Sequence, residues 1–376
     1  MAEKTMRGES ALPVRSRIYR TLYDQKSFCS RQMLAEACSV SMPTLHQNLK
    51  ELMDEGLIRY SGTGRSTGGR RAQGLDIEPE ARVSLGAALA EDHLRLVAVD
   101  LRLRELAYRK LPFDAVKRLP DYETELPAIV DAFLSDAGLD RQRVLGLGLA
   151  VPGVLTPDAS RILFAPTLGL RDVPIRMLTQ GIPYPVHVEN DGSVSGHAEG
   201  FFRGTRQNMA YLSLEDGVGG AVLMAGRPYP GDSARSGEFG HICVEPGGLR
   251  CRCGKQGCLE AYCSARRVEQ SLGVDTETFF RGVEQHLPEY ENLLYDMLRH
   301  LATAILSIRL TLDCDVVLGG FFSEYLSPYL PILRQYVLSG DPFDGDAGFV
   351  QLSTLRRHIT PLGAALYFVR EFVTSV

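Results

Sequence analysis

One short polar segment places three cysteines close to a histidine and so limits how this chain can fold. The segment is Cys251-Arg252-Cys253-Gly254-Lys255-Gln256-Gly257-Cys258, and His241 precedes it by ten residues. One imidazole and three thiolates form the ligand set of a tetrahedral zinc ion, and the glycines allow a short loop to curl around it. Because protein ligands fill all four positions, His241, Cys251, Cys253 and Cys258 are predicted to form a structural zinc site.

The other cysteines offer alternatives to this interpretation. Five of the eight cysteines lie between positions 243 and 263, which is unlike a disulfide framework and is typical of metal binding in a reducing compartment. Buried free cysteines are the simpler reading, but three in eight residues of a glycine-rich loop do not resemble a core strand. Cys243 and Cys263 lie nearby, and neither fits the compact spacing as well.

The length and the charge distribution indicate separate domains. The chain has 376 residues, more than the roughly 250–300 that one hydrophobic core supports. Its first 72 residues hold twelve Lys/Arg and seven Asp/Glu, whereas the rest holds 29 and 39. A basic head therefore precedes an acidic body, which is typical of binding to a polyanion, although a solvated face is an equally common cause. Apolar stretches such as 144–151 are too short to span a membrane, and no apolar signal core begins the chain, so we expect a cytoplasmic protein without a membrane partner.

The head has the pattern of a winged helix-turn-helix. Apolar residues recur at helical spacing in three pieces, of which the second opens at Ser30 and the third at Ser41, both typical N-caps. Gly56 ends the third helix, and the expected strands 57–60 and 74–77 enclose a glycine-rich loop. After a tail of residues 1–12, residues 13–78 are thus predicted to bind double-stranded operator DNA, with a helical protein-interaction module as the alternative.

Two groups of side chains in this head suit DNA. The third helix turns polar groups away from its leucines, and these can read base edges in the major groove, while the loop arginines can follow phosphates. The candidate DNA contacts are Thr44, Gln47, Asn48, Lys50, Arg65, Arg70 and Arg71.

From residue 83 the apolar pattern changes from helical to alternating. Strands are expected over 83–90, 94–101, 105–112 and 144–151, with a helix at 120–137, and the theme recurs with strands at 210–214, 220–225 and 315–318. The sequence therefore predicts an α/β body over 79–376 with an internal duplication of the ribonuclease-H-like, actin/hexokinase type. We expect a smaller lobe at about 83–193, a larger lobe at about 194–360 and a C-terminal helix at 361–376, with ligands bound between the lobes.

Several of these segments together resemble the ROK family of sugar kinases and sugar-responsive repressors. The resemblance covers about residues 83–376 and rests on Gly237-Glu238-Phe239-Gly240-His241, the cysteine loop with Leu259-Glu260, Gly148-Leu149-Ala150-Val151-Pro152-Gly153, Phe164-Ala165-Pro166, Glu189-Asn190-Asp191 and Val317-Leu318-Gly319-Gly320. The head, with Gly68-Gly69-Arg70-Arg71, resembles the DNA-binding domain that the repressor branch carries.

The resemblance implies a sugar site in the interlobe cleft. It assigns sugar binding to Asn190, Asp191, Glu238, His241 and Glu260, whose carboxylates and amide suit neighbouring hydroxyls, and His241 would offer its second ring nitrogen to the sugar. In a kinase of this family Asp191 would be the general base. The resemblance implies a hexose or an amino sugar. Many kinase members have Asn where this chain has Thr167, so the resemblance does not decide between these sugars.

Two expected hairpin turns argue against a kinase. Where the family has Asp followed by Gly-Gly-Thr, this chain has Ala88-Leu89-Ala90-Glu91-Asp92-His93, and Glu215-Asp216 precede the glycines of the second turn. A carboxylate about 4 Å from a phosphate oxygen costs on the order of 1–4 kcal/mol, so we expect weak ATP binding. The sequence thus predicts a sugar-responsive transcriptional repressor, not an enzyme, acting as a homodimer or homotetramer. A ROK sugar kinase and a sugar-binding protein without regulatory output are the alternatives.

Overall fold

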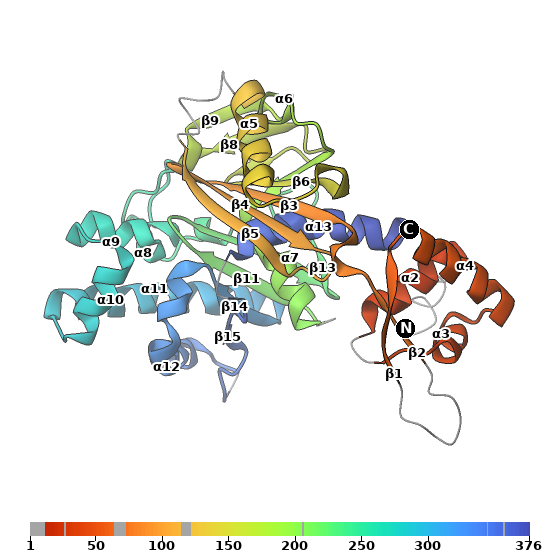
Figure 1. The fold of residues 1–376 in the computed structure, drawn as a ribbon. Coiled ribbons are helices and arrows are strands. Elements are labelled where there is room, and N and C mark those ends of the chain that lie inside the picture. The colour runs from red at the N-terminus through yellow and green to blue at the C-terminus, as the bar shows by residue number, and fades with distance from the viewer. Residues whose placement is uncertain are drawn as a thin grey trace.

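The computed structural model describes residues 12–25, 28–63, 73–113, 122–204, 207–343, 345–355 and 358–376. A small N-terminal head lies at one side of a larger body that contains two sheets, and the C-terminus ends beside the head (Figure 1). No helix in this part of the chain is long and apolar enough to cross a membrane.

The head has the element order predicted for a winged helix. It consists of α2 (Val14–Asp24), α3 (Arg31–Cys38), α4 (Met42–Asp54) and the antiparallel strands β1 (Ile58–Thr63) and β2 (Gln73–Ile77). The side chains of Ser30 and Ser41 accept hydrogen bonds from the third amide after them, and they cap α3 and α4 as predicted. The loop between the strands, with Arg65, Arg70 and Arg71, lies outside the described residues.

The first sheet of the body has the order β10-β6-β3-β4-β5. Its strands are β3 (Val83–Leu89), β4 (His93–Asp100), β5 (Glu105–Pro112), β6 (Val144–Val151) and β10 (Val186–Asn190). The hairpin strands β3, β4 and β5 pair antiparallel, and β6 joins β3 in parallel. Every residue of β3 is buried, because α5 (Tyr122–Asp136) covers one face of the sheet and the C-terminal helix covers the other.

The second sheet repeats this plan, which confirms the predicted duplication. Its order is β13-β12-β11-β14-β15, built from β11 (Met209–Leu214), β12 (Val218–Met224), β13 (Arg227–Pro228), β14 (Asp315–Gly319) and β15 (Val350–Leu352). Again an antiparallel hairpin, β11 with β12, is followed by a parallel strand, β14. Its helices are α8 (Glu260–Cys263), α9 (Ala265–Leu272), α10 (Thr276–Glu284), α11 (Pro288–Leu312) and α12 (Leu330–Gly340).

A third, small sheet was not predicted from the sequence. It is formed by β7 (Val154–Leu155), β8 (Arg161–Ala165) and β9 (Leu170–Pro174), and α6 (Arg176–Thr179) follows it. These strands are two to five residues long. Too few residues alternate in them to give a periodic signal in the sequence.

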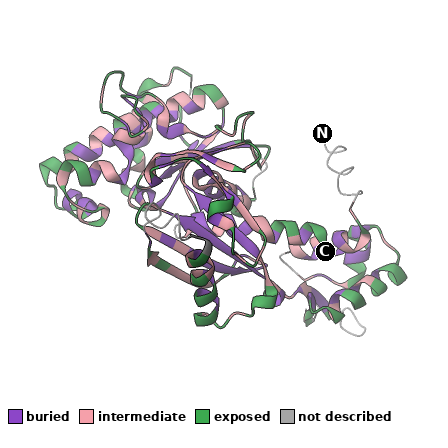
Figure 2. Cartoon of the chain, turned by 90° about the horizontal axis from the view of Figure 1, so that it is seen from above, coloured by how far each residue is buried: buried purple, intermediate pink, exposed green. Residues whose placement is uncertain are grey.

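Two helices lie between the large sheets. The C-terminal helix α13 (Ile359–Ser375) packs on β3 and β6 of the first sheet, while α7 (Asp191–Arg203) packs on β11 and β12 of the second. A Cβ atom on Gly86 or Gly148 would lie 1.8 Å or 2.0 Å from a carbonyl oxygen of α13, so only glycine allows this close approach. Figure 2 shows that buried positions predominate where these helices meet the sheets.

The head shares a hydrophobic core with the body. Tyr19 and Leu22 of α2 belong to the same buried cluster as Val99 of β4 and Val369 of α13. Arg102, in the turn after β4, donates hydrogen bonds to carbonyl oxygens at the end of α2 and lies 2.7 Å from Asp76 of β2. The head is therefore fixed against the body by packing as well as by the chain connection.

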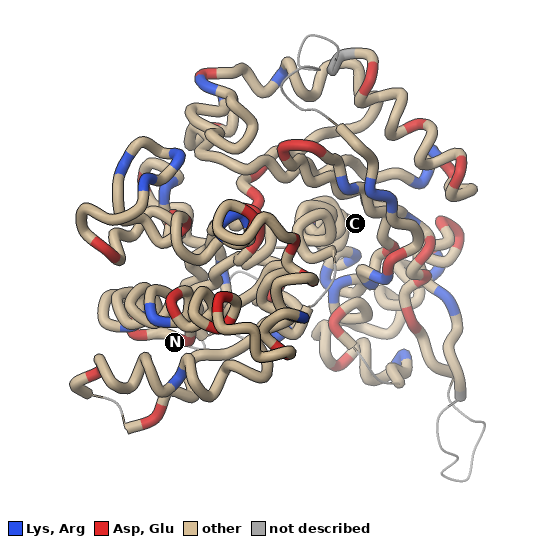
Figure 3. Tube along the Cα trace, turned by 90° about the vertical axis from the view of Figure 1, so that its left-hand side faces the viewer, with Lys and Arg blue, Asp and Glu red and all other residues tan. Residues whose placement is uncertain are grey.

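Most of the excess of basic over acidic residues in the head does not lie on its helices. Residues 12–25 and 28–63 contain six Lys/Arg and five Asp/Glu, so most of the excess lies in segments that the structure does not describe. Acidic and basic positions are interspersed along the trace of both head and body (Figure 3). Among the described residues of the head, Arg15 pairs with Glu55 and Arg59 with Glu78.

Candidate functional site

The four predicted metal ligands come together in the second lobe, the half of the body built on the second sheet; the first lobe is the half built on the first sheet. One ligand atom each from His241, Cys251, Cys253 and Cys258 can be chosen so that all lie within 4.8 Å of one another. Cys251 Sγ is 3.8 Å from His241 Nδ1, and Cys253 Sγ is 3.7 Å from Cys258 Sγ. Three sulfurs and one nitrogen at this spacing form a cluster that could hold a metal ion.

The loop geometry accounts for the glycines in this segment. Gly254 and Gly257 have φ values of 93° and 83°, a backbone region that other residues rarely adopt, and they reverse the chain so that the sulfurs converge. The two other cysteines in the segment are not in the cluster. Cys243 is exposed, and the thiol of Cys263 donates to the carbonyl of Met297 in α11.

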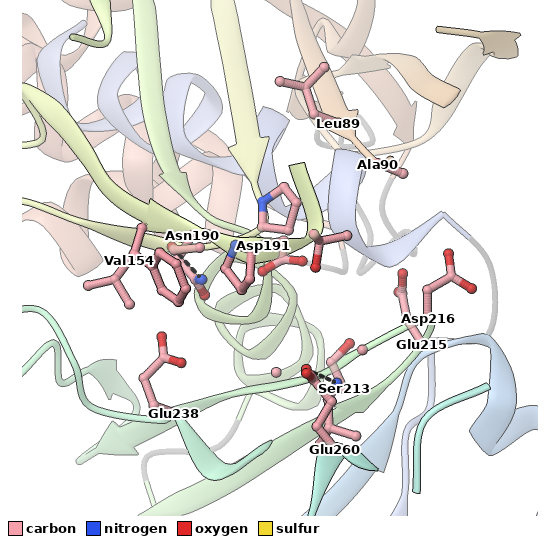
Figure 4. A pocket seen from close by; sticks show the side chains of 18 of the residues that line it. Leu89, Ala90, Val154, Asn190, Asp191, Ser213, Glu215, Asp216, Glu238 and Glu260 are labelled. Atoms are coloured by element: carbon pink, nitrogen blue, oxygen red, sulfur yellow. Dashed lines mark hydrogen bonds between the residues drawn. The ribbon is translucent and has the colours of Figure 1, made fainter. Parts of the chain in front are cut away.

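A pocket between the lobes brings together all five residues that the resemblance assigns to sugar binding. Asn190, Asp191, Glu238, His241 and Glu260 all line it, and Figure 4 shows the acidic and amide side chains from both lobes facing this space. The position that departs from the kinase pattern, Thr167, lines it too.

The β10–α7 junction holds two of these groups rigidly. Asn190 is the N-cap of α7: its side-chain oxygen accepts from the amide of Ser193, and its side-chain nitrogen donates to the carbonyl of Gly153. Asp191 begins the helix, and one of its oxygens accepts from the amide of Gly192. Both side chains are therefore oriented by backbone groups before a ligand enters.

The metal cluster and the pocket share their wall. His241 belongs to both, and its Nε2 lies 3.8 Å from a carboxylate oxygen of Glu238. Glu260 follows the last cysteine of the cluster, where one of its oxygens accepts from the amide of Val218 and the other lies 3.6 Å from Cys251 Sγ. The position of two pocket residues thus depends on the conformation of the cysteine loop.

Asp191 lies in an unusually acidic environment. Burial raises the pKa of its carboxyl to about 7, and the neighbouring Glu215 and Glu238 act in the same direction. The amide of Gly192 and the guanidinium of Arg95 oppose this shift. Burial likewise raises the pKa of Glu238. The pocket thus contains a carboxyl group, that of Asp191, that holds or gives up a proton near neutral pH.

One carboxylate in each acidic turn pairs with arginine from the other lobe. Glu91, in the β3–β4 turn, lies 2.6 Å from Arg266 and 3.2 Å from Arg252, both of the second lobe. Glu215, in the β11–β12 turn, lies 3.2 Å from Arg95 of the first lobe. From the sequence, only the repulsion between these carboxylates and the phosphates of ATP was considered. Their arginine partners could not be identified, because these lie far away in the sequence.

These ion pairs, the interlobe pairs, connect the two lobes. Arg252 lies between two cysteines of the metal cluster, so one pair joins the cysteine loop to the first lobe. Arg95 also lines the pocket, but it was not predicted from the sequence. The one feature that could have pointed to it is its charge within the alternating strand β4. The hydroxyl of Thr360, at the start of α13, donates to Glu215 at 3.4 Å. The cleft is thereby connected to the helix that reaches the head.

The predicted base-reading residues lie on the outer side of α4. Thr44, Gln47 and Lys50 are exposed and Asn48 is half-buried, while the leucines of this helix face the head's core. The amide of Gln47 donates to Glu51, and that of Asn48 donates to the carbonyl of Thr44. Contact with a base would require these two amides to exchange partners within the helix.

Comparison with known proteins finds a matching family model and relatives that are named as repressors. The model of the ROK family matches residues 87–339. The chain is 28% identical over 248 residues to a xylose repressor of Bacillus subtilis and 26% identical over 258 residues to an N-acetylglucosamine repressor of Escherichia coli O157:H7. These alignments cover 65% and 68% of this chain and 64% and 63% of the relatives, so they span less than two thirds of each relative's length.

Solved structures agree with the fold. A ROK family transcriptional regulator, described as a homolog of the E. coli MLC protein, superposes with a TM-score of 0.74 at 21% identity and covers 96% of both chains. A ROK hexokinase from Thermus thermophilus gives a TM-score of 0.60 at 28% identity and covers 77% of this chain and 99% of its own. The regulator thus shares the fold over nearly the whole chain, whereas the kinase matches a shorter part.

Proposed function

The chain belongs to the ROK family, and from that premise we propose that it is a sugar-responsive transcriptional repressor. One observation carries the proposal: a winged helix-turn-helix head shares its hydrophobic core with a body whose interlobe pocket is lined by the family's sugar-binding residues. The relatives named xylose repressor and N-acetylglucosamine repressor support the proposal. A regulator must join a DNA-binding element to an effector site, and the roles proposed for the head and for the pocket meet this requirement.

The proposed effector is a hexose or an amino sugar bound in the pocket. Asn190 and Asp191 from one side and Glu238, His241 and Glu260 from the other would hydrogen-bond its hydroxyls. Carboxylates accept such bonds from two directions, and the backbone contacts that already orient Asn190, Asp191 and Glu260 reduce the entropy lost on binding. The sugar is thus expected to bind across both lobes and to favour one lobe arrangement.

The metal cluster is proposed to be a structural zinc site. His241, Cys251, Cys253 and Cys258 would hold the ion, and zinc supplies there a four-coordinate cross-link that stabilises a loop with little core of its own. Three sulfurs and a nitrogen leave no place for a reacting water. Its role in function would be indirect, because the ion would hold His241 and the loop that precedes Glu260.

The head is proposed to bind operator DNA as the sequence predicts. Thr44, Gln47, Asn48 and Lys50 would lie at the major groove, and Arg65, Arg70 and Arg71 would contact phosphates or the minor groove. A homodimer or homotetramer would present two heads to half-sites separated by whole helical turns. Since the end of α13 packs on α2, a change at the pocket reaches the head through a helix that contacts both.

A sugar kinase is the second candidate, because one observation favours it. A carboxyl group with a pKa of about 7 in the sugar pocket, that of Asp191, is suited to take a proton from a sugar hydroxyl. Against it, acidic residues of the two turns that would approach ATP phosphates form the interlobe pairs, and the first of these turns has no glycine. A triphosphate would have to break these pairs, so we propose that the chain is not an enzyme.

A gel shift on the DNA upstream of the protein's own gene tests the proposal, repeated with a panel of pentoses, hexoses and N-acetylhexosamines. A specific shift that one sugar alters is the expected result. The Gln47→Ala variant should lose specificity, and Arg176→Gln, an exposed change in α6 far from the head, is the matched control. Absence of any specific shift together with ATP-dependent sugar phosphorylation would instead establish the kinase.

A further inference from the structure

A second hollow lies at the junction of head and body, away from the sugar pocket. This junction groove has a volume of about 810 Å³, within the range of small-molecule sites. Four elements line it: α2 of the head, the second half of α7, the turn into β13 and the last turns of α13. Neither the cleft residues nor the predicted DNA contacts belong to its lining, so the functions proposed above leave it unused.

Positive charge gathers in this groove. Arg20 of α2, Arg227 of β13 and Arg370 of α13 line it, and Asp24 is the carboxylate among its described lining residues. Asp24 lies 3.8 Å from Arg20 on the same helix. Neither Arg227 nor Arg370 has a carboxylate within ion-pair distance in the described part of the chain. The lining thus carries three guanidinium groups against one acid, an excess of two positive charges.

The three arginines line one hollow, and the charges of the other two act on Arg370. Burial together with the charges of Arg227 and Arg20 lowers the pKa of Arg370. Arg370 Nη1 donates to His197 Nε2 of α7, and burial and the charge of Arg370 lower the pKa of His197 to about 4. His197 is therefore neutral at pH 7 and orients the guanidinium without neutralising it.

We propose that the junction groove binds a phosphate dianion, held between the guanidinium groups of Arg227 and Arg370. A phosphomonoester carries about −1.5 to −2 charges at pH 7, which matches the excess in the lining, and guanidinium groups bind such oxygens in a bidentate manner. The volume leaves room for the organic part of a small phosphorylated metabolite, and inorganic phosphate offers the same chemistry.

Because the junction groove is lined by both head and body, a ligand bound there would affect how the head packs on the body. Arg20 belongs to the head, whereas Arg227 and Arg370 belong to the body, so a bound dianion attracts charges on both sides of the junction. Occupancy adds contacts between α2 and the body and raises the stability of their packing. A phosphorylated ligand at this groove would thus act on the head independently of the sugar in the cleft.

Isothermal titration of the full chain tests this site. The probes are inorganic phosphate, glycerol 3-phosphate and glycerol, each at constant ionic strength kept by chloride. Glycerol 3-phosphate has no sugar ring, so the result does not depend on the sugar pocket. We expect saturable binding of at least one phosphate and none of glycerol, with affinity about tenfold weaker in Arg227→Gln. Preference for glycerol 3-phosphate indicates a metabolite, and equal affinity indicates inorganic phosphate.

Two controls separate a specific phosphate site from a general effect of positive charge. Arg176→Gln removes the same charge from α6, far from the groove, and should leave phosphate binding unchanged; an equal loss there would mean that only net charge matters. Lack of saturable binding by either phosphate overturns the proposal. If Arg227→Gln then reduced the salt dependence of operator binding, the groove would be a contact for the DNA backbone instead.

Discussion

Replacing Asp191 by asparagine should stabilise the protein at alkaline pH. The pKa of this carboxyl is raised from 3.8 to about 7 in the folded chain, so ionisation disfavours the native state. A rise of about three units corresponds to a penalty of about 4 kcal/mol, which is an upper value because water can enter the open side of the pocket. The side chain of asparagine keeps the oxygen that accepts from Gly192 and removes the charge.

The sign of the pH dependence follows from proton binding. Between about pH 4 and pH 7 the native state holds the proton on Asp191 and the unfolded chain does not, so the free energy of unfolding falls as the pH rises through this window. Below pH 4 both states are protonated and the penalty is absent. The asparagine variant should therefore match the wild type near pH 4 and exceed it by about 2–4 kcal/mol at pH 8.

Denaturant unfolding of both proteins at half-unit pH steps, followed by circular dichroism, measures this difference. Asp131→Asn is the matched control, because Arg141 lowers the pKa of Asp131 and this variant should not gain stability with rising pH. A difference between wild type and Asp191→Asn that does not change with pH would refute the proposed burial penalty. Sugar affinity should fall in the same variant, since an amide replaces a carboxylate in the pocket.

Three other changes test separate parts of the molecule. Cys253→Ser should lower the zinc content from one ion per chain to near zero, measured by plasma emission spectrometry; full retention would exclude Cys253 as a ligand. Gly86→Ala places a Cβ 1.8 Å from the Pro361 carbonyl oxygen and should cost about 3 kcal/mol or more, whereas Gly345→Ala meets no atom within 4 Å and should be neutral in thermal unfolding. Arg71→Ala should weaken binding to all DNA sequences and reduce the salt slope by about 0.9, and an unchanged slope in filter binding would remove it from the phosphate contacts.

The regular elements followed closely from the sequence. Strands β5 and β6 begin and end where the alternating pattern predicts, and both serine caps in the head form as predicted. Long elements with one buried face repeat their apolar residues often enough to be recognised. The sheet β7–β9 was missed because its strands are too short for such repetition, although the segment Phe164-Ala165-Pro166, which includes the end of β8, was recognised as a family segment.

The residues of the candidate site followed from spacing and resemblance. The metal ligands lie within 18 positions of one another, so a local loop can bring them together, and the five cleft residues lie in segments that the ROK family shares. Their assembly in one pocket agrees with that expectation.

The sequence by itself determined the local chemistry: helix caps, strand alternation, the cysteine loop and the identity of the polar residues at the ends of strands. Tertiary structure alone decided which distant charges meet. The partners of Glu91 lie 161 and 175 positions away, and the junction groove combines α2 with α13 from opposite ends of the chain. Periodicity and capping report interactions within about four residues, whereas an ion pair between lobes depends on how the packed sheets place their turns. For this reason the sequence predicted repulsion at the two acidic turns, and the fold supplies arginines there.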